Sequence, residues 1–204
     1  MTLLSILLSW FPSIIISLAI GSFISICFHP NFLNISCLIF ILYGIPLIIY
    51  RIHNLFYPLK AGVTYLLDKK YSPWWGSHQI QTIYIAFPVL ETLLRLIPGL
   101  FSIWLRLWGA KIGKNIYWTP KLEIADRGLI EIGDNVIFGY GIRLYSHVIK
   151  PKKNNLMLYV KKIQIGNNVF IGAGCRFGPG VNIKDETFIP VTTDLYPNKN
   201  ANIN

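Results

Sequence analysis

His147 is the residue of this 204-residue chain best suited to acid–base chemistry, and it is the only histidine after residue 110. Neutral imidazole can take a proton from a hydroxyl or an amine near neutral pH. His147 stands where a repeated six-residue pattern stops, and loops carried by rigid scaffolds are where binding and catalysis concentrate. The sequence therefore predicts a general base at His147, with an ordinary structural histidine as the alternative.

The six-residue pattern is clearest from Ile165 to Ile189. An Ile or Phe opens each six, a Gly often comes second, and a small or β-branched residue comes fifth. The fifth residues are Val169, Cys175, Val181 and Thr187. A period of six fits neither a single strand nor a helix, and it is typical of a β-solenoid in which three short strands form one triangular coil. Stacked coils of this kind bury a continuous core.

The predicted solenoid domain covers residues 110–197. Its hexads begin near Ile112, continue at Trp118 and Ile124, slip by two residues, and resume at Ile132. The pattern stops after His147, and residues 150–162 form a polar excursion before Ile165 restarts the count. Residues 198–204 are expected to form a polar tail.

The first fifty residues carry no Lys, Arg, Asp or Glu. Two apolar runs, Leu3 to Phe28 and Leu33 to Tyr50, are long enough to cross a bilayer as helices. Residues 1–50 are therefore predicted to form a transmembrane helical hairpin, with re-entrant segments as the alternative because Pro46 lies late in the second run. Arg51 and three lysines follow the hairpin, so the positive-inside rule places the rest of the chain on the cytoplasmic side of the inner membrane.

Residues 51–109 are predicted to be a connector of interfacial, amphipathic helices. Leu, Ile, Phe and Trp recur at helical spacing from Pro88 to Trp108, with an interruption at Pro98-Gly99. We expect these helices to lie on the membrane surface, which is compatible with the alternative of a helical cap on the solenoid's end. The segment Trp74-Trp75-Gly76-Ser77-His78 fits either the membrane–water interface or the wall of a ligand pocket.

From Ile112 to Thr193 the chain resembles the hexapeptide-repeat acyltransferases, especially the sugar O-acetyltransferases of the maltose, galactoside and capsule-biosynthesis type. The resemblance implies a mainly β fold, a left-handed parallel β-helix, assembled as a homotrimer with active sites between subunits. It also implies an acyl-CoA co-substrate in the groove between solenoids, with no permanently bound cofactor. The matching motifs are Ile112-Gly113-Lys114-Asn115, Ile132-Gly133-Asp134-Asn135-Val136, Ile165-Gly166-Asn167-Asn168-Val169-Phe170-Ile171-Gly172 and Pro179-Gly180-Val181.

The resemblance also assigns roles to single residues. His147 occupies the place of the family's catalytic histidine. Asp126 falls where sugar-acetylating relatives have a substrate-contacting aspartate, with a turn residue as the alternative. Lys121 stands near a polar Asn of the relatives, and we group it with Asp126 and Tyr145 as predicted substrate-binding residues.

The acyl donor is expected to meet a different set of residues. A pantetheine arm could approach closely at Gly172, Ala173 and Gly174. Lys161 and Lys162 belong to five lysines of the excursion that could meet CoA phosphates, an acidic carrier protein or the membrane, or could form a merely solvated loop. The residues after Ile189 depart from the family's pattern. The predicted contacts with the acyl donor are therefore limited to these three residues and the lysines.

Other chemistries fit poorly. A zinc carbonic anhydrase needs three His ligands, and this solenoid has one, so no metal is expected. No nucleic-acid partner is expected, because the aromatic residues cluster in the apolar half rather than among basic residues. We therefore predict a membrane-anchored acyltransferase of polysaccharide biosynthesis. It would move an acyl group, by preference acetyl, from a CoA or carrier-protein thioester to a hydroxyl of a glycan or lipid-linked acceptor. The alternative is a catalytically silent solenoid that scaffolds a membrane assembly complex.

Overall fold

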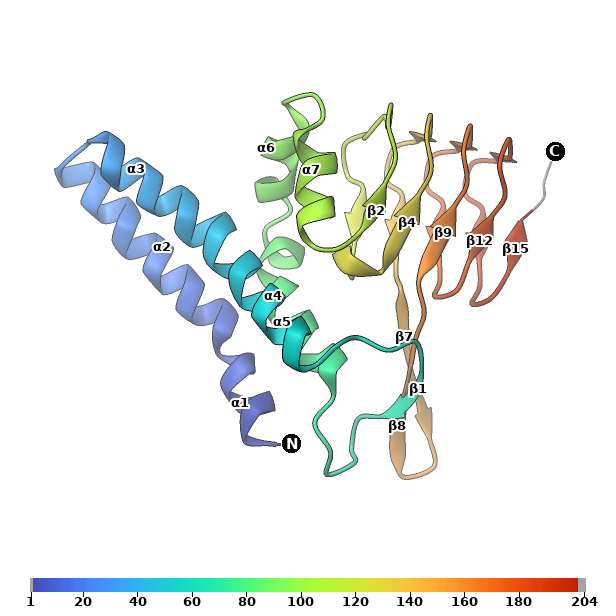
Figure 1. Cartoon of the computed structure of the whole chain (residues 1–204), viewed down its shortest axis with the longest axis horizontal. Helices are drawn as coiled ribbons and strands as arrows, with labels where there is room; N and C mark the ends of the chain where they lie inside the picture. The colour runs from blue at the N-terminus through green and yellow to red at the C-terminus, as the bar shows by residue number, and fades with distance from the viewer. Residues whose placement is uncertain (1, 202–204) are drawn as a thin grey trace. The chain divides into compact units, whose positions relative to one another are not determined.

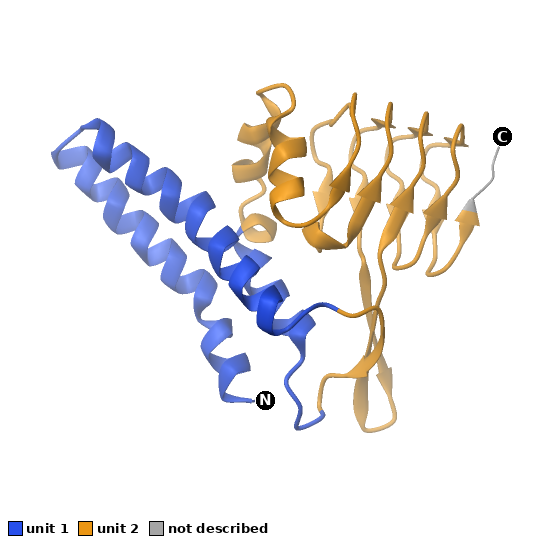
Figure 2. Ribbon diagram, in the orientation of Figure 1, with its two compact units in different colours: residues 1–59, 68–83 blue, residues 60–67, 84–204 orange. Residues whose placement is uncertain are grey.

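The computed structural model describes residues 2–201, which form two compact units (Figure 2). The first unit holds the residues up to Leu59 together with Asp68–Ile83, and the second holds Lys60–Leu67 together with the chain from Tyr84 onward. The units do not follow the predicted segment boundaries, because a strand from Lys60–Leu67 pairs with the excursion of the solenoid.

The first unit is helical and contains two apolar rods. Each rod is long and apolar enough to cross a membrane, namely Leu3–Phe28 and Phe32–Phe56. The helices are α1 (Leu3–Ser9), α2 (Phe11–Phe28), α3 (Phe32–Ile39) and α4 (Ile45–Phe56), with a π-helical turn at Phe40–Gly44. The long helix α5 (Pro73–Ala86) begins in this unit and ends in the second.

The ends of the apolar helices follow from single residues. The Thr2 and Asn31 side chains accept hydrogen bonds from the backbone N–H groups of Ser5 and Asn34, which caps α1 and α3. Pro46 has no N–H to donate to a residue one turn back, and the backbone widens into the π-helical turn just before it. The second rod continues beyond the predicted end at Tyr50 because no helix-breaking residue occurs before Tyr57-Pro58.

The second unit is a stack of parallel coils with three faces (Figure 1). One face is the sheet β2 (Lys111–Ile112), β4 (Ile130–Ile132), β9 (Ile163–Ile165), β12 (Asn182–Ile183) and β15 (Asn200–Ala201). The second face is β5 (Ile137–Phe138), β10 (Phe170–Ile171) and β13 (Phe188–Ile189). The third is β3 (Glu123–Ile124), β6 (Arg143–Leu144), β11 (Arg176–Phe177) and β14 (Asp194–Leu195). The coils thus extend past the predicted end at residue 197.

The predicted inward residues form the core of these coils. The hexad-opening and fifth-position residues are buried, among them Ile132, Val136, Phe138, Leu144, Ile165, Val169, Ile171, Cys175, Phe177, Val181, Ile183, Thr187 and Ile189. Burial raises the pKa of the Cys175 thiol, whose Sγ donates a hydrogen bond to the Pro190 carbonyl. Cys175 is therefore a small core residue, as its register predicts, and the six-residue period is confirmed.

Strand register explains the two irregularities of the pattern. Asn182 pairs with Asn200, one coil of three hexads further on, whereas Lys111 pairs with Glu131, two residues more than that spacing. The predicted slip is real, and the 3₁₀ turn Arg127–Leu129 accommodates it. Asn115, Asn135 and Asn168 stack at one corner with φ near +55°, a backbone region that Asn tolerates well.

The excursion is not a loop but a β-hairpin. Strands β7 (His147–Lys152) and β8 (Asn155–Val160) pair antiparallel, and β1 (Gly62–Tyr65) adds a third strand on the other side of β8. Leu158 and Val160 of β8 are buried. This three-stranded sheet stands outside the coils and carries His147 at the start of its first outgoing strand.

Helices α6 (Val89–Arg95) and α7 (Leu100–Leu107) close the first coil of the solenoid (Figure 1). Phe101, Trp104 and Leu105 are buried, and the Trp118 indole N–H donates a 2.8 Å hydrogen bond to Ser102 Oγ. Gly99, at φ +81°, allows the chain to turn between the two helices. The helical cap that was one of the two expectations for this segment is therefore present.

Candidate active site

Two predicted site residues lie in direct contact. His147 Nδ1 is 2.6 Å from Asp126 Oδ2, the distance of a charge-assisted hydrogen bond. Because an ionised carboxylate only accepts, this contact makes Nδ1–H the donor, and proton transfer would then use Nε2. Asp126 is 1% exposed and His147 is partly exposed, so the aspartate is the inner member of the pair.

Strand register is what brings the pair together. Strands β3 and β6 are parallel neighbours in which Ile124 pairs with Leu144. Asp126 follows the first strand and His147 follows the second, so both leave the same edge of the same face. Ser146 Oγ donates to the Leu129 carbonyl at 3.0 Å and fixes the point at which the hairpin departs.

The backbone beside Asp126 is held by a buried ion pair. Arg127 and Glu91 form two hydrogen bonds, 2.6 Å from Nε to Oε1 and 3.0 Å from Nη2 to Oε2. Trp104 Nε1 donates to the same Glu91 carboxylate, and the Arg127 guanidinium lies over the Tyr84 ring. This network ties helix α6 to the first coil directly next to the aspartate.

Tyr145 directly follows β6 and lies beside this edge, whereas Lys121 precedes β3 and lies at the other end of these strands. Tyr145 Oη donates to Glu123 Oε2 at 3.1 Å, and burial, followed by the Glu123 charge, raises the pKa of Tyr145. Lys121 projects over the Tyr140 ring, and its hydrogen bond with Tyr140 raises the pKa of the amine.

A cavity of about 520 Å³ connects several of these groups. Lys121, Glu123 and Arg143 line it from the coils, and Pro88, Glu91 and Arg95 line it from the cap. Ile124 and Arg127, which flank Asp126 by one or two residues, also reach its wall. A pocket with convergent cations and a carboxylate can bind a polar, hydroxyl-rich ligand.

The residues predicted to meet the acyl donor serve mainly within the fold. A Cβ added at Gly172 would lie 2.5 Å from the backbone nitrogen of Val191, so the spacing between coils requires glycine there. The Ala173 carbonyl accepts a backbone hydrogen bond from Thr192, and the Gly174 N–H donates one to the Tyr140 carbonyl, each in a neighbouring coil.

The two predicted donor-site lysines point to different partners. Lys161 Nζ donates to Asn198 Oδ1 at 3.0 Å, and Lys162 Nζ donates to Glu131 Oε1 at 2.7 Å. Among the described residues, Lys161 and Lys162 therefore do not line a common pocket with Gly172, Ala173 and Gly174.

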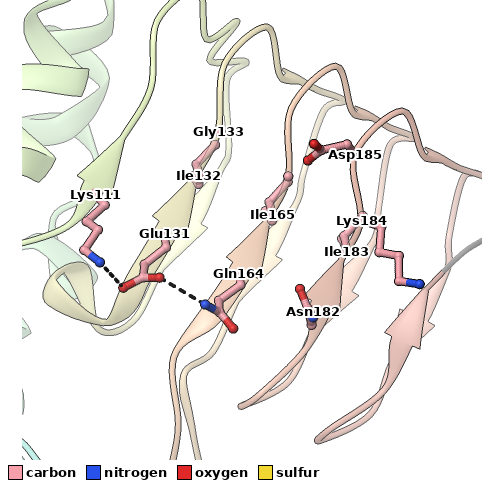
Figure 3. Close-up of a pocket in the computed structure, with 11 residues that line it drawn as sticks. Lys111, Glu131, Ile132, Gly133, Gln164, Ile165, Asn182, Ile183, Lys184 and Asp185 are labelled. Carbon is pink, nitrogen blue, oxygen red and sulfur yellow. Dashed lines mark hydrogen bonds and ion pairs between the residues drawn. The ribbon is translucent and has the colours of Figure 1, made fainter.

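A second hollow, of about 650 Å³, lies on the outer face of the sheet that contains β4 and β9 (Figure 3). Glu131 is its central charge, with Lys111 and Lys162 on Oε1 and Gln164 on Oε2. These hydrogen bonds, that of Lys162 first, lower the pKa of Glu131 to about 2. Neither this hollow nor the 520 Å³ cavity is lined by His147 or Asp126. Only the cavity is lined by residues that flank Asp126, namely Ile124 and Arg127, so the candidate active site is the Asp126–His147 edge beside that cavity.

Glu123, Arg143 and the Glu91–Arg127 pair were missed by reasoning from the sequence. Glu123 and Arg143 pair across β3 and β6, and Arg143 Nε lies 3.4 Å from Glu123 Oε2. The slip predicted after Ile124 already implies that Glu123 and Arg143, 20 residues apart, lie on neighbouring strands. The charged positions i and i+20 were the available signal.

Several curated relatives of the chain are named as acetyltransferases. Galactoside O-acetyltransferase of Escherichia coli K12 is 37% identical over 94 residues, which cover 43% of this chain and 46% of that protein. A putative colanic acid biosynthesis acetyltransferase of the same organism is 24% identical over 152 residues, which cover 63% of this chain and 83% of that protein. The chain thus spans about half the length of the first of these proteins. No family model matches the chain.

Solved structures of the same kind are more distant. A maltose O-acetyltransferase from Clostridium difficile 630 has a TM-score of 0.41 at 16% identity and covers 69% of this chain and 87% of its own. A galactoside acetyltransferase in complex with coenzyme A has a TM-score of 0.38 at 23% identity, covering 55% and 74%. By sequence, the resemblance of this chain to the hexapeptide-repeat acetyltransferases, galactoside O-acetyltransferase among them, is therefore confirmed.

Proposed function

We propose that the chain is an O-acyltransferase that moves an acetyl group from a thioester to an acceptor hydroxyl, with His147 as general base. The observation that carries the proposal is the 2.6 Å contact between His147 Nδ1 and Asp126 Oδ2. A carboxylate in this position fixes the tautomer of the imidazole and stabilises the imidazolium that forms on proton transfer. Curated relatives named as acetyltransferases support the reaction class.

The proposed step conserves atoms and charge. Nε2 of His147 takes the proton of the acceptor hydroxyl as its oxygen attacks the thioester carbonyl carbon. The tetrahedral oxyanion collapses, the carbon–sulfur bond breaks, and the leaving thiolate takes the proton back from the imidazolium. Backbone N–H groups are the expected donors to the oxyanion.

The proposed acceptor is a glycan, free or lipid-linked, bound in the cavity that Lys121, Glu123 and Arg143 line. Charged donors and acceptors on one wall suit the hydroxyls of a sugar. The names of the relatives, which mention a galactoside and colanic acid, support a saccharide. Asp126 would then act mainly by orienting His147. Tyr145, which donates a hydrogen bond to Glu123, would contact the acceptor at the edge of this cavity.

The proposed donor is acyl-CoA, or the thioester of an acyl carrier protein. Its phosphates would meet lysines of the hairpin, and its pantetheine arm would run beside Gly172–Gly174. Lys161 and Lys162 would have to exchange their hydrogen bonds with Asn198 and Glu131 for contacts with the donor.

The proposed localisation is the inner membrane, with the solenoid on its cytoplasmic side. The two apolar rods are the support for an anchor, and Arg51 with the following lysines supports the orientation. An anchor is useful when the acceptor is itself in the membrane, because the two partners then meet in two dimensions.

The proposed assembly is a homotrimer of left-handed coils with active sites between subunits. Its support is an apolar ladder on the outside of one face: Tyr117, Ile137, Phe170 and Phe188 follow one another in strand register and are 43–64% exposed. An outward apolar row of this kind is typical of an interaction surface. A second copy would cover it and supply a second wall for the site.

The test is a mass-spectrometric comparison of lipids and cell-surface glycans from a deletion host complemented with wild-type protein or with His147→Ala. Restoration of an acetyl-sized mass by wild type alone would name the product and support the base. Restoration by both proteins would remove His147 from the chemistry. Modification of soluble sugars only would contradict the membrane acceptor.

A second candidate is a catalytically silent scaffold for a membrane glycan assembly. The fold's own use of Gly172, Lys161 and Lys162 favours it. It predicts that the glycan requires the protein but carries no acetyl difference, and that acyl-CoA does not bind in calorimetry.

A further inference from the structure

The cap of the solenoid contains a cavity that the proposed reaction does not use. It measures about 600 Å³ and lies between the α6–α7 connection, α7 and the first coil. We call it the cap cavity and define it by Arg95, Phe101, Ile103, Arg106, Lys114 and Trp118, which are among its lining residues. Every charged residue in its lining is a cation.

Arg95 is the cation of this cavity whose guanidinium lacks an ion pair among the described residues, although the charge of Glu91 acts on it. Its Nη2 donates to the Leu122 carbonyl at 2.9 Å and its guanidinium lies 4.3 Å from the Phe101 ring centroid. Within residues 2–201 no carboxylate forms an ion pair with it, and its buried Nε has no hydrogen-bond partner there. Glu91, the nearest acid on its own helix, is already held by Arg127 and Trp104.

Arg95 is partly buried, and a partly buried charge without an ion-pair partner is stabilised by an anionic ligand. Burial lowers the pKa of Arg95, because removal from water disfavours the charged form of the guanidinium. Lys114 is exposed at the cavity's coil side, and Arg106 reaches the neighbouring carbonyls of Ile112 and Gly113. Three cations around one cavity therefore favour an anionic ligand, and the geometry of a guanidinium suits a phosphate.

The walls and the surroundings indicate that this anion carries an apolar chain. Phe101, Ile103 and Trp118 line the cavity beside the cations. Around it the cap exposes large apolar side chains, with Leu96 at 73% and Ile97 at 57%. An apolar band that surrounds a basic recess matches the chemistry of a lipid with an anionic headgroup.

We propose that the cap cavity binds the phosphate headgroup of an anionic membrane lipid, with Arg95 as the principal contact. The apolar chains of the lipid run out over Leu96 and Ile97 at the α6–α7 turn. The site contains neither His147 nor Asp126, and Arg95 is the one charged residue that it shares with the wall of the proposed acceptor cavity.

The test measures lipid binding to the full chain in detergent by native mass spectrometry. The probes are phosphatidic acid, diacylglycerol and inorganic phosphate. Phosphatidic acid should bind wild type, and Arg95→Gln should weaken this binding about tenfold. Lys114→Gln, an exposed change that keeps the fold, should weaken it several-fold. Arg176→Gln removes an equal charge from another face of the solenoid and should leave it unchanged.

Three results would overturn the proposal. Equal binding of diacylglycerol would mean that the apolar band alone holds lipid. Equal competition by inorganic phosphate would mean a site for free anions. Equal losses in Arg95→Gln, Lys114→Gln and Arg176→Gln would mean unspecific charge attraction. His147→Ala should retain phosphatidic acid binding, so a failure of the proposed acetyl transfer would not be mistaken for a failure of this site.

Discussion

His147 Nδ1 and Asp126 Oδ2 lie 2.6 Å apart although 20 other residues separate them in the chain. Asp126→Asn should lower kcat about 100-fold or more, because an amide can donate to Nδ1 and so favour the wrong tautomer. Steady-state acetyl transfer to the identified acceptor is the measurement, with Asp185→Asn, at an outer corner of the coils, as the control. Unchanged kcat in Asp126→Asn would leave the aspartate as a turn residue only.

Gly172→Ala should destabilise the solenoid by several kcal/mol, since the new Cβ would lie 2.5 Å from the Val191 backbone nitrogen. Gly141 is the matched control, because its φ is +72° and a Cβ there would meet nothing within 4 Å. Gly141→Asn meets no steric clash and keeps only the strain of a left-handed backbone, so it should cost about 1 kcal/mol. Denaturant unfolding of the purified chain measures both, and a stable Gly172→Ala protein that fails to bind acyl-CoA would instead support the donor role.

Glu91→Gln should cost about 3–5 kcal/mol of unfolding free energy, because it leaves the Arg127 charge buried without its carboxylate. Glu123→Gln, which breaks a half-exposed pair with Arg143, should cost about 1 kcal/mol or less. Unfolding curves of the two variants against wild type test the contrast. Similar small losses in both would show that the cap does not depend on the buried pair.

The Glu131 cluster predicts an acid-dependent contribution to stability. Because the pKa of Glu131 is lowered from 4.5 to about 2 on folding, its contribution is present above pH 4.5 and is lost as the pH falls toward 2. The unfolding free energies of wild type and Glu131→Gln should therefore differ at pH 6 and converge at pH 2–3. A difference that stays constant over this range would mean that the lysines do not hold the carboxylate in solution.

Phe170→Glu should convert the proposed trimer into monomers, because it places a charge in the middle of the apolar ladder. Light scattering in detergent, corrected for bound detergent, gives the mass of the protein component. Ile149→Glu, at an exposed position of the hairpin, is the control and should keep the wild-type mass. An unaltered mass for Phe170→Glu would show that this face is not the subunit interface.

The solenoid was predictable because its signal repeats. Each coil requires the same kind of residue at the same position, so Val169, Cys175, Val181 and Thr187 reinforce one another. Even the slip near Ile124 could be read, since the pattern resumes two residues late. The contact between Asp126 and His147, however, followed from a resemblance and not from the repeat.

The hairpin and the cap were harder to predict for a physical reason. Strand β1 has only four residues, and its partner β8 begins about ninety residues later in the chain. A non-local pair of this kind leaves no periodic mark in either segment. The Glu91–Arg127 pair likewise depends on how helix α6 packs against the first coil. Two isolated charges in a sequence do not predict that packing.

The pairing of Gly62 with Val160 also sets an order of events during synthesis. At roughly 5–20 residues per second, β1 leaves the ribosome several seconds before β8 exists. During that interval its backbone groups are satisfied by water or by a temporary neighbour. The hairpin that presents His147 consequently reaches its full three-stranded pairing only after the apolar N-terminal helices have been made.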